Sequence, residues 1–246
     1  MLFQKNSVTL VAGHWLLPLT ASNQKQETSN QKTNNMSHNL NGRSPFIAIA
    51  GNIGVGKTTL TKLLVERYGW KGFFEQEVAN PYLADFYQDM PAWAFQSQIF
   101  FLKERLKDHL QIQAASAPSV QDRTIYEDAE IFAHNLFERG LMHARDYAVY
   151  TDLYAAISSS LRPPDLFVYL RASTWTLISR IRKRGRAYEQ NIDKEYLAQL
   201  NLNYERWVKR IFEQYNVMIV DTDAYDVHRD KDWLDGVIAE IQRRVG

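Results

Sequence analysis

The chain reads Gly51-Asn52-Ile53-Gly54-Val55-Gly56-Lys57-Thr58 from residue 51 to residue 58, with Thr59 next. This stretch fits the pattern G-x-x-x-x-G-K-[ST]. The apolar run 46–50 before it is typical of a short buried strand, and residues 57–68 after it carry leucines at helical spacing. A strand before the loop and a helix after it argue against a chance match. The stretch therefore predicts a loop that binds phosphate.

Each residue type in this loop has a chemical reason. Glycines let backbone N–H groups close around phosphate oxygens without Cβ clashes. The start of the following helix adds a field that favours anions. Lys57 can bridge the terminal phosphates of a nucleotide, and the hydroxyl of Thr58 can ligate Mg²⁺. We therefore expect ATP and Mg²⁺ as cofactors, with ATP bound by residues 51–59.

The composition excludes several classes of function. A net charge of +1 over 246 residues gives no general attraction to nucleic acid or to a membrane surface. The chain has no cysteine, so disulfides and thiolate metal sites are excluded, and its six histidines show no H-E-x-x-H spacing. No apolar run approaches the roughly 20 residues that span a bilayer. We expect neither nucleic acid nor membrane as a partner.

Residues 1–44 differ from the rest of the chain. The segment 21–43 is rich in Asn, Gln, Ser, Thr and Lys, a composition that cannot bury enough surface to order itself. Lys5 ahead of the mildly apolar stretch 8–19 leaves a secretory signal as one alternative, and translation from Met36 as another. A P-loop enzyme needs the nucleotide pools of the cytosol, so we expect a cytoplasmic protein. We expect 1–44 to be a disordered tail, 1–35 to be dispensable, and 45–246 to be the functional domain.

Strands and helices alternate from residue 45 onward. The strands lack the polar alternation of a solvated sheet, which favours a parallel sheet buried on both faces. The expected fold is α/β, with a five-stranded parallel sheet flanked by helices and strand 46–50 at its centre. Strands are expected at 46–50, 71–75, 118–122, 166–170 and 217–221, and helices at 57–68, 92–115, 129–139, 147–161, 174–184, 193–214 and 230–244.

Charged residues follow several of these elements. One predicted strand ends in Glu75, another ends in Asp122-Arg123-Thr124, and a predicted helix runs into the basic stretch 180–186. Ligands of open α/β sheets bind at the carboxyl ends of the strands. One carboxylate can accept the proton of an attacking hydroxyl, a second can hold Mg²⁺, and arginines can neutralise a transferred phosphoryl group. Each feature alone has an ordinary explanation as a cap, an ion pair or a solvated helix face, but together they predict phosphoryl transfer.

These motifs are similar to those of a known family. Residues 45–246 resemble the deoxyribonucleoside kinases related to deoxycytidine, deoxyguanosine and bacterial deoxyadenosine kinases. The resemblance implies a P-loop kinase fold with a short Arg-rich lid, which phosphorylates the 5′-hydroxyl of a deoxynucleoside in nucleotide salvage. The motifs that carry it are GNIGVGKTT at 51–59, Glu75 five residues before Asn80-Pro81-Tyr82-Leu83, Tyr87 ahead of Trp93-Ala94-Phe95-Gln96-Ser97-Gln98, Asp122-Arg123-Thr124-Ile125-Tyr126-Glu127-Asp128, and Arg184-Gly185-Arg186 with Glu189.

The resemblance implies roles for residues at the reacting end of the site. Glu75 matches the general base that activates the 5′-hydroxyl, and Arg123 matches the arginine that orients it. With Lys57, they make up the expected catalytic set. Asp122 matches the acidic residue of the metal site and joins Thr58 there. The lid arginines are matched by Arg180, Arg184 and Arg186.

It implies further roles around the nucleoside. Tyr87 and Glu189 match the pair that holds the sugar 3′-hydroxyl. Gln98 and Asp128 match the residues that read the base, and Phe132 matches the aromatic side chain that stacks on it. Independently of the resemblance, a glutamine offers both a donor and an acceptor to a base edge. Phe132 lies one helical turn beyond Asp128, so both can face one pocket, although phenylalanine is also a common core residue.

The chain departs from the family pattern at three positions. Gln76 stands where a proline often follows the base, and Glu77 comes next as a second candidate base. Asp122 is one methylene shorter than the usual glutamate. Phe101 replaces a smaller residue, which leaves the size of the base pocket open.

Arg105 bears on the choice of substrate. It lies seven residues after Gln98, two helical turns along the same face, so it can reach the same pocket and pair with Asp128. In the family this pair marks the kinases of purine deoxynucleosides and deoxycytidine. We expect a purine deoxynucleoside as substrate, with deoxycytidine accepted and thymidine poor. The resemblance also implies a homodimer, with helices near 129–161 at its interface.

Two other classes of protein remain as alternatives. A nucleoside monophosphate kinase of the thymidylate kinase type shares the P-loop and the Asp-Arg motif, but it needs basic residues for the acceptor's phosphate where this chain has Glu75, Tyr87 and Gln98. A non-catalytic accessory protein with the kinase fold should have lost parts of the site, whereas this chain keeps them. A GTPase is disfavoured because the DxxG and NKxD motifs are absent.

Overall fold

The computed structural model describes residues 43–75, 80–189, 192–225 and 230–245. Of the expected tail, only Arg43 and Ser44 belong to the described residues, so Met36 lies outside them. Gln76 and Glu77 also lie outside the described residues. Arg43 pairs with Asp165 (2.9 Å between Nη2 and Oδ1).

A five-stranded parallel sheet forms the centre of the domain, as the sequence predicts. The strand order is β2-β3-β1-β4-β5, so β1 is central. β1 aligns Ile49 with Asp122 on one neighbour and Ile47 with Leu166 on the other, and its five residues are all buried. The strands are β1 (Phe46–Ala50), β2 (Lys71–Phe73), β3 (Ser119–Asp122), β4 (Leu166–Arg171) and β5 (Val217–Asp221).

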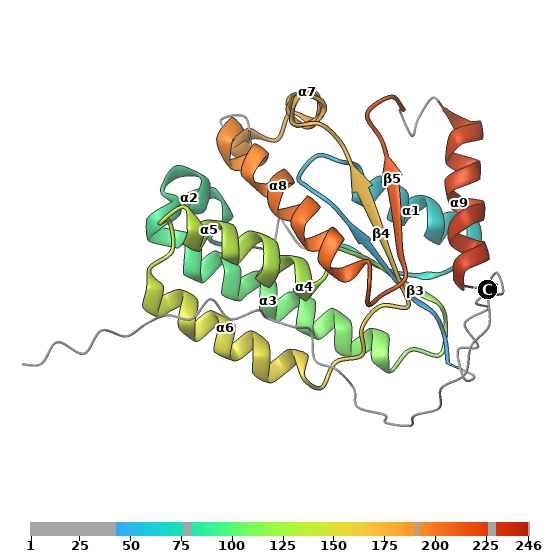
Figure 1. The fold of residues 1–246 in the computed structure, drawn as a ribbon, viewed down its shortest axis with the longest axis horizontal. Helices are drawn as coiled ribbons and strands as arrows, with labels where there is room; N and C mark the ends of the chain where they lie inside the picture. The colour runs from blue at the N-terminus through green and yellow to red at the C-terminus, as the bar shows by residue number, and fades with distance from the viewer. Residues whose placement is uncertain (1–42, 76–79, 190–191, 226–229, 246) are drawn as a thin grey trace, which may run out of the picture. The chain divides into compact units, whose positions relative to one another are not determined.

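Helices connect the strands and cover both faces of the sheet. Figure 1 shows α1 and α9 on one side of the sheet, and α3 and α8 on the other. None of the described helices is long and apolar enough to cross a membrane. The helices are α1 (Lys57–Tyr68), α2 (Leu83–Gln88), α3 (Met90–Gln113), α4 (Ile125–Glu127), the π-helical η2 (Asp128–Ala133), α5 (His134–Glu138), α6 (Ala144–Ser158), α7 (Thr174–Arg184), the 3₁₀ segment η3 (Ala187–Glu189), α8 (Lys194–Ile211) and α9 (Lys231–Val245).

The structure corrects the expected elements in three places. The helix expected at 129–139 begins at Ile125, because the side chain of Thr124 and that of Glu127 form a capping box that starts it earlier. The strand expected at 71–75 ends at Phe73, where its pairing with β3 stops. Glu75 therefore lies two residues beyond the carboxyl end of β2. The short helix α2, absent from the sequence-based prediction, carries Tyr87.

The two faces of the sheet have different cores. On the face of α1 and α9, aliphatic side chains such as Ile47, Val168 and Leu64 form one cluster. On the other face aromatic rings meet, for example Phe167 with Trp207 (5.7 Å between ring centroids) and Tyr169 with Tyr204 (5.6 Å). The aromatic face also carries buried polar groups, among them the hydroxyl of Tyr204, which donates to Oε1 of Glu127 (2.8 Å).

Candidate active site

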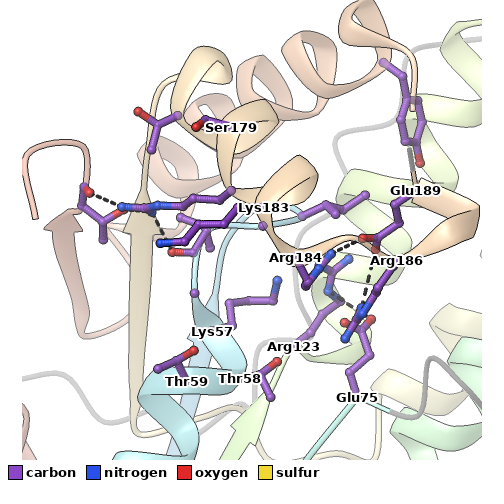
Figure 2. Close-up of a pocket in the computed structure, with 18 of the residues that line it drawn as sticks. Lys57, Thr58, Thr59, Glu75, Arg123, Ser179, Lys183, Arg184, Arg186 and Glu189 are labelled. Carbon is purple, nitrogen blue, oxygen red and sulfur yellow. Dashed lines mark hydrogen bonds and ion pairs between the residues drawn. The ribbon is translucent and has the colours of Figure 1, made fainter. Parts of the chain in front are cut away.

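A cavity of about 1000 Å³ opens at the carboxyl ends of the strands. Seventeen of the 21 predicted site residues line it, and Figure 2 shows several of them converging from different elements. Gly51, Asn52, Arg105 and Asp122 do not line the cavity but lie behind its walls. The seventeen are Ile53, Gly54, Val55, Gly56, Lys57, Thr58, Thr59, Glu75, Tyr87, Gln98, Arg123, Asp128, Phe132, Arg180, Arg184, Arg186 and Glu189.

The loop 51–56 joins β1 to α1 and forms one end of the cavity. Gly51 adopts φ 142°, and a Cβ built there would lie 2.6 Å from the carbonyl oxygen of Leu170, so only glycine fits. The side chain of Asn52 donates to the carbonyl of Leu197 (3.0 Å) and to Oδ1 of Asn201 (2.6 Å). The loop thus packs closely against β4 and is hydrogen-bonded to α8.

Lys57 lies at the start of α1 with its ammonium group buried. Burial lowers its pKa to about 8, and nearby Arg123 acts in the same direction, while Asp122 opposes them. Its Nζ donates to the carbonyl of Asn52 (3.2 Å). An anion bound in the loop would restore the charge balance around this lysine.

Asp122 and Thr58 form a pair that fits a magnesium ion. Oγ1 of Thr58 donates to Oδ2 of Asp122 (2.5 Å), while Oδ1 of Asp122 is buried and has no hydrogen-bond partner among the described residues. Burial raises the pKa of Asp122 even though Lys57 is close. The described residues contain no group of three or more His, Cys, Asp or Glu side chains that could hold a metal. Mg²⁺ in nucleotide sites takes one or two protein oxygens and completes its shell with phosphates and water, so this donor set suits it.

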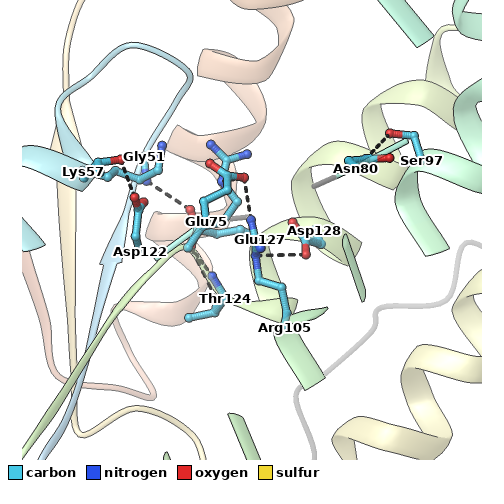
Figure 3. A network of polar contacts seen from close by, with 12 residues as sticks. Gly51, Lys57, Glu75, Asn80, Ser97, Arg105, Asp122, Thr124, Glu127 and Asp128 are labelled. Carbon is cyan, nitrogen blue, oxygen red and sulfur yellow. Dashed lines mark hydrogen bonds and ion pairs between the residues drawn. The ribbon is translucent and has the colours of Figure 1, made fainter. Parts of the chain in front are cut away.

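Glu75 is held by two arginines at the other end of the cavity (Figures 2 and 3). Its Oε1 lies 2.5 Å from Nη2 of Arg105 and 3.5 Å from Nε of Arg123. Burial alone would raise the pKa of Glu75, but Arg123 and Arg105 outweigh it and bring the pKa to about 2. Arg123 has φ 68°, a left-handed conformation that costs energy in a residue other than glycine and directs its side chain back over the ring of Phe132 (4.1 Å from Cζ to the ring centroid).

Arg105 links Glu75 to Asp128 (Figure 3). Its side chain is 1% exposed, and its Nε lies 3.2 Å from Oδ2 of Asp128, so the pairing that the spacing predicts is present. Burial raises the pKa of Asp128 to about 6, against the opposing effect of Arg105. Gln98, on the same helix as Arg105, has a buried Oε1 without a partner among the described residues, and the ring of Phe101 lies beside Arg105 (5.5 Å).

The basic stretch 180–186 covers the last turns of α7 and the two residues after it, and its arginines line the cavity. Arg184 and Arg186 both approach Glu189, with Nη2 of Arg184 2.5 Å from Oε2 and Nη1 of Arg186 3.5 Å from Oε1. Arg180 donates instead to the carbonyl of Val55 (3.2 Å) and to that of Thr222 (2.6 Å). Arg180 therefore lies against the phosphate-binding loop and the segment after β5, whereas Arg184 and Arg186 lie against Glu189.

Comparisons with known proteins agree with this geometry. A family model described as deoxynucleoside kinase matches residues 47–245. The chain belongs to the deoxynucleoside kinase family. It is a phosphotransferase, and the resemblance seen in its motifs is confirmed.

Relatives of this kinase are named for different deoxynucleosides. A deoxyadenosine/deoxycytidine kinase of Bacillus subtilis is 36% identical over 201 residues, covering 81% of this chain and 92% of that protein. A deoxyadenosine kinase of Dictyostelium discoideum is 41% identical and covers 73% of each chain. A structure of the deoxyadenosine kinase of M. mycoides, solved with dCMP and dCDP, superimposes with a TM-score of 0.73 at 34% identity, covering 80% of this chain and 98% of that one.

Some residues of this deoxynucleoside kinase site escaped the sequence reasoning. One wall of the cavity, which we call the far wall, is formed by residues that follow the carboxyl ends of β4 and β5. Because ligands bind at the carboxyl ends of parallel strands, these residues could have been predicted from their position in the sequence. Glu127, buried behind the phosphate-binding loop, was visible only as part of the pattern T-x-x-E at 124–127. The missed residues of this wall include Trp175, Thr176, Ser179, Thr222, Asp223 and Tyr225, and they stand beside Lys183 of the predicted basic stretch.

Proposed function

We propose that this kinase transfers the γ-phosphoryl group of ATP, with Mg²⁺, to the 5′-hydroxyl of a purine deoxynucleoside. The observation that carries the proposal is the position of Arg105, buried between Glu75 and Asp128. It ties the group that would activate the hydroxyl to the group that would read the base.

We assign the following roles to the reacting groups. Glu75, ionised at neutral pH, accepts the proton of the 5′-hydroxyl as the oxygen attacks the γ-phosphorus. A bond forms between that oxygen and phosphorus, and the bond from phosphorus to the β,γ-bridging oxygen breaks, which leaves ADP. Lys57 and the lid arginines neutralise the charge on the phosphates. Mg²⁺ held at Thr58 and Asp122 would supply further charge neutralisation on the phosphate oxygens.

The proposed preference for purines rests on the polar edge made by Gln98 and Asp128, which Arg105 supports from behind the cavity wall. A buried carboxylate can accept a hydrogen bond from an exocyclic amino group, and Gln98 offers both a donor and an acceptor. Thymine lacks the amino group, so it leaves Asp128 without its donor, and it carries a 5-methyl group that needs space at the wall which Arg105 backs. A site of this kind rejects a ligand that leaves its buried polar groups unpaired by up to ~10⁴-fold.

The decisive experiment is a panel of the four deoxynucleosides with labelled ATP, which yields kcat/KM for each. We expect deoxyadenosine or deoxyguanosine to lead, deoxycytidine to follow and thymidine to be the poorest. Thymidine as the best substrate would overturn the preference. Turnover of deoxynucleoside monophosphates in place of deoxynucleosides would overturn the proposed acceptor.

We also propose that the kinase is a homodimer through α6 and its neighbours. Val149 and Leu153 lie one helical turn apart on α6 and are 57% and 41% exposed, and Leu110 on α3 is 53% exposed. Sedimentation at micromolar concentration should give twice the 28.6 kDa of one chain. A Val149→Asp, Leu153→Asp variant should sediment as a monomer, and a wild-type particle of one chain would count against the dimer.

A further inference from the structure

Glu127 is a buried carboxylate with no assigned task in phosphoryl transfer. Its side chain is fully enclosed and does not line the cavity. Oε1 accepts from the backbone N–H of Gly51 (3.1 Å) and from the hydroxyl of Tyr204 (2.8 Å). Oε2 accepts from the backbone N–H of Thr124 (3.0 Å). Figure 3 shows it between the phosphate-binding loop and the loop after β3.

These contacts join three segments that the reaction must keep in register. Gly51 opens the phosphate-binding loop, and Thr124 directly follows Asp122 and Arg123. Tyr204 belongs to α8, which also holds Asn52 through Leu197 and Asn201. The carboxylate therefore sits where the donor end of the site, the acceptor end and α8 meet.

Helix capping does not account for this arrangement. A capping box needs only the reciprocal contacts within residues 124–127. Oε1 makes none of these, and its partners lie 76 and 77 positions away in the sequence. Each carboxylate oxygen accepts from one backbone N–H, that of Gly51 or that of Thr124, so a glutamine of the same size must turn its NH₂ group toward one of these donors.

We propose that Glu127 is a positioning residue, which holds the entry of the phosphate-binding loop at a fixed distance from the loop that carries Asp122 and Arg123. Through this carboxylate the phosphates of the donor are aligned with the hydroxyl of the acceptor. A displacement of about 1 Å at reacting groups can cost ~10²-fold in rate without any loss of substrate contacts. The proposal rests on ATP as the donor.

The test compares Glu127→Gln, Tyr204→Phe and the double variant in kcat, KM for MgATP and Kd for the deoxynucleoside. Tyr169→Phe is the matched control, because Tyr169 stacks on Tyr204 and its hydroxyl donates to Glu205 rather than to Glu127 (3.0 Å). We expect Glu127→Gln to lower kcat ~10–100-fold and to raise KM for MgATP, with Kd for the deoxynucleoside within about twofold of wild type. Tyr204→Phe should lower kcat/KM for MgATP about threefold or more, and Tyr169→Phe less than twofold.

The double variant separates positioning from simple destabilisation. Because Tyr204 is expected to act through Glu127, the double variant should be no slower than Glu127→Gln alone. Losses that multiply, or Tyr204→Phe and Tyr169→Phe behaving alike, would overturn the proposal, and the second comparison stands even where Glu127→Gln does not fold. The wild-type rate with ATP tests the donor assignment separately, because only the ratios between variants bear on Glu127.

Discussion

The two ends of the cavity are built in different ways. The donor end consists of consecutive residues, 51–59, and its shape comes from backbone conformation and one anchored glycine. The acceptor end is assembled from side chains that come from the end of β2, from α3, from the loop after β3 and from η2. The charges there are shared among Glu75, Arg105, Arg123 and Asp128. Substitutions at the donor end should therefore alter ATP binding, and those at the acceptor end should alter turnover and substrate choice.

Glu75→Gln should have the largest effect, and this effect should be confined to the acceptor end of the cavity. Loss of a general base typically lowers turnover ~10²–10⁴-fold, while an amide of the same size keeps most contacts with the nucleoside. The measurements are kcat and the Kd of deoxyadenosine. Glu77→Gln is the control and should keep near-normal turnover. If Glu75→Gln stays active and Glu77→Gln is dead, the base is Glu77.

Arg105→Met with Asp128→Ala should change which substrate the acceptor end prefers. Removing both charges removes the polar edge and opens space for a methyl group, so the ratio of kcat/KM for thymidine to that for deoxyadenosine should rise on the order of 10²–10³-fold. KM for MgATP should stay within about twofold, since neither residue belongs to the donor end. An unchanged ratio would show that other residues determine which nucleobase is accepted.

Gly51→Ala should damage the donor end. The new Cβ meets the carbonyl of Leu170 at 2.6 Å, at a φ that disfavours other residues, so the loop must shift. We expect KM for MgATP to rise about tenfold or more, with little change in the Kd of deoxyadenosine. Gly56→Ala is the matched control, because it also has a positive φ but no atom within 4 Å of the added Cβ. Equal effects of the two changes would mean that backbone strain, not the collision, is decisive.

The binding of deoxyadenosine should depend on pH through Asp128. Burial raises the pKa of Asp128 to about 6, whereas Arg123 and Arg105 keep that of Glu75 near 2. The ionised form of Asp128 is the one that accepts a hydrogen bond from an amino group. Affinity measured without ATP should therefore be constant above pH about 7 and fall up to ~tenfold per unit below pH about 6. Asp128→Asn should flatten this profile, and a wild-type affinity that improves on acidification would show that the protonated acid reads the base.

The sequence alone was enough for the fold and the donor end. Strands rich in buried apolar residues and the pattern at 51–58 predict the parallel sheet with β1 at its centre, because both signals are local. Helical spacing placed Arg105 on the face of Gln98, and the family resemblance placed Asp128 in the same pocket, so their pairing could be expected. The early start of the helix at Ile125 required the capping box to be noticed.

Only the tertiary structure decided how charge is distributed in the site. Arg105 and Glu75 are 30 positions apart and meet because α3 packs beside the end of β2. Glu75, the expected general base, therefore contacts a second arginine besides Arg123. Glu127 reaches Gly51 and Tyr204 only when the sheet and α8 are assembled. Contacts of this kind depend on where buried side chains point after packing, and burial then sets their pKa values. A local sequence pattern is enough to predict the phosphate-binding loop, whereas long-range packing determines which charged side chains lie beside one another around it.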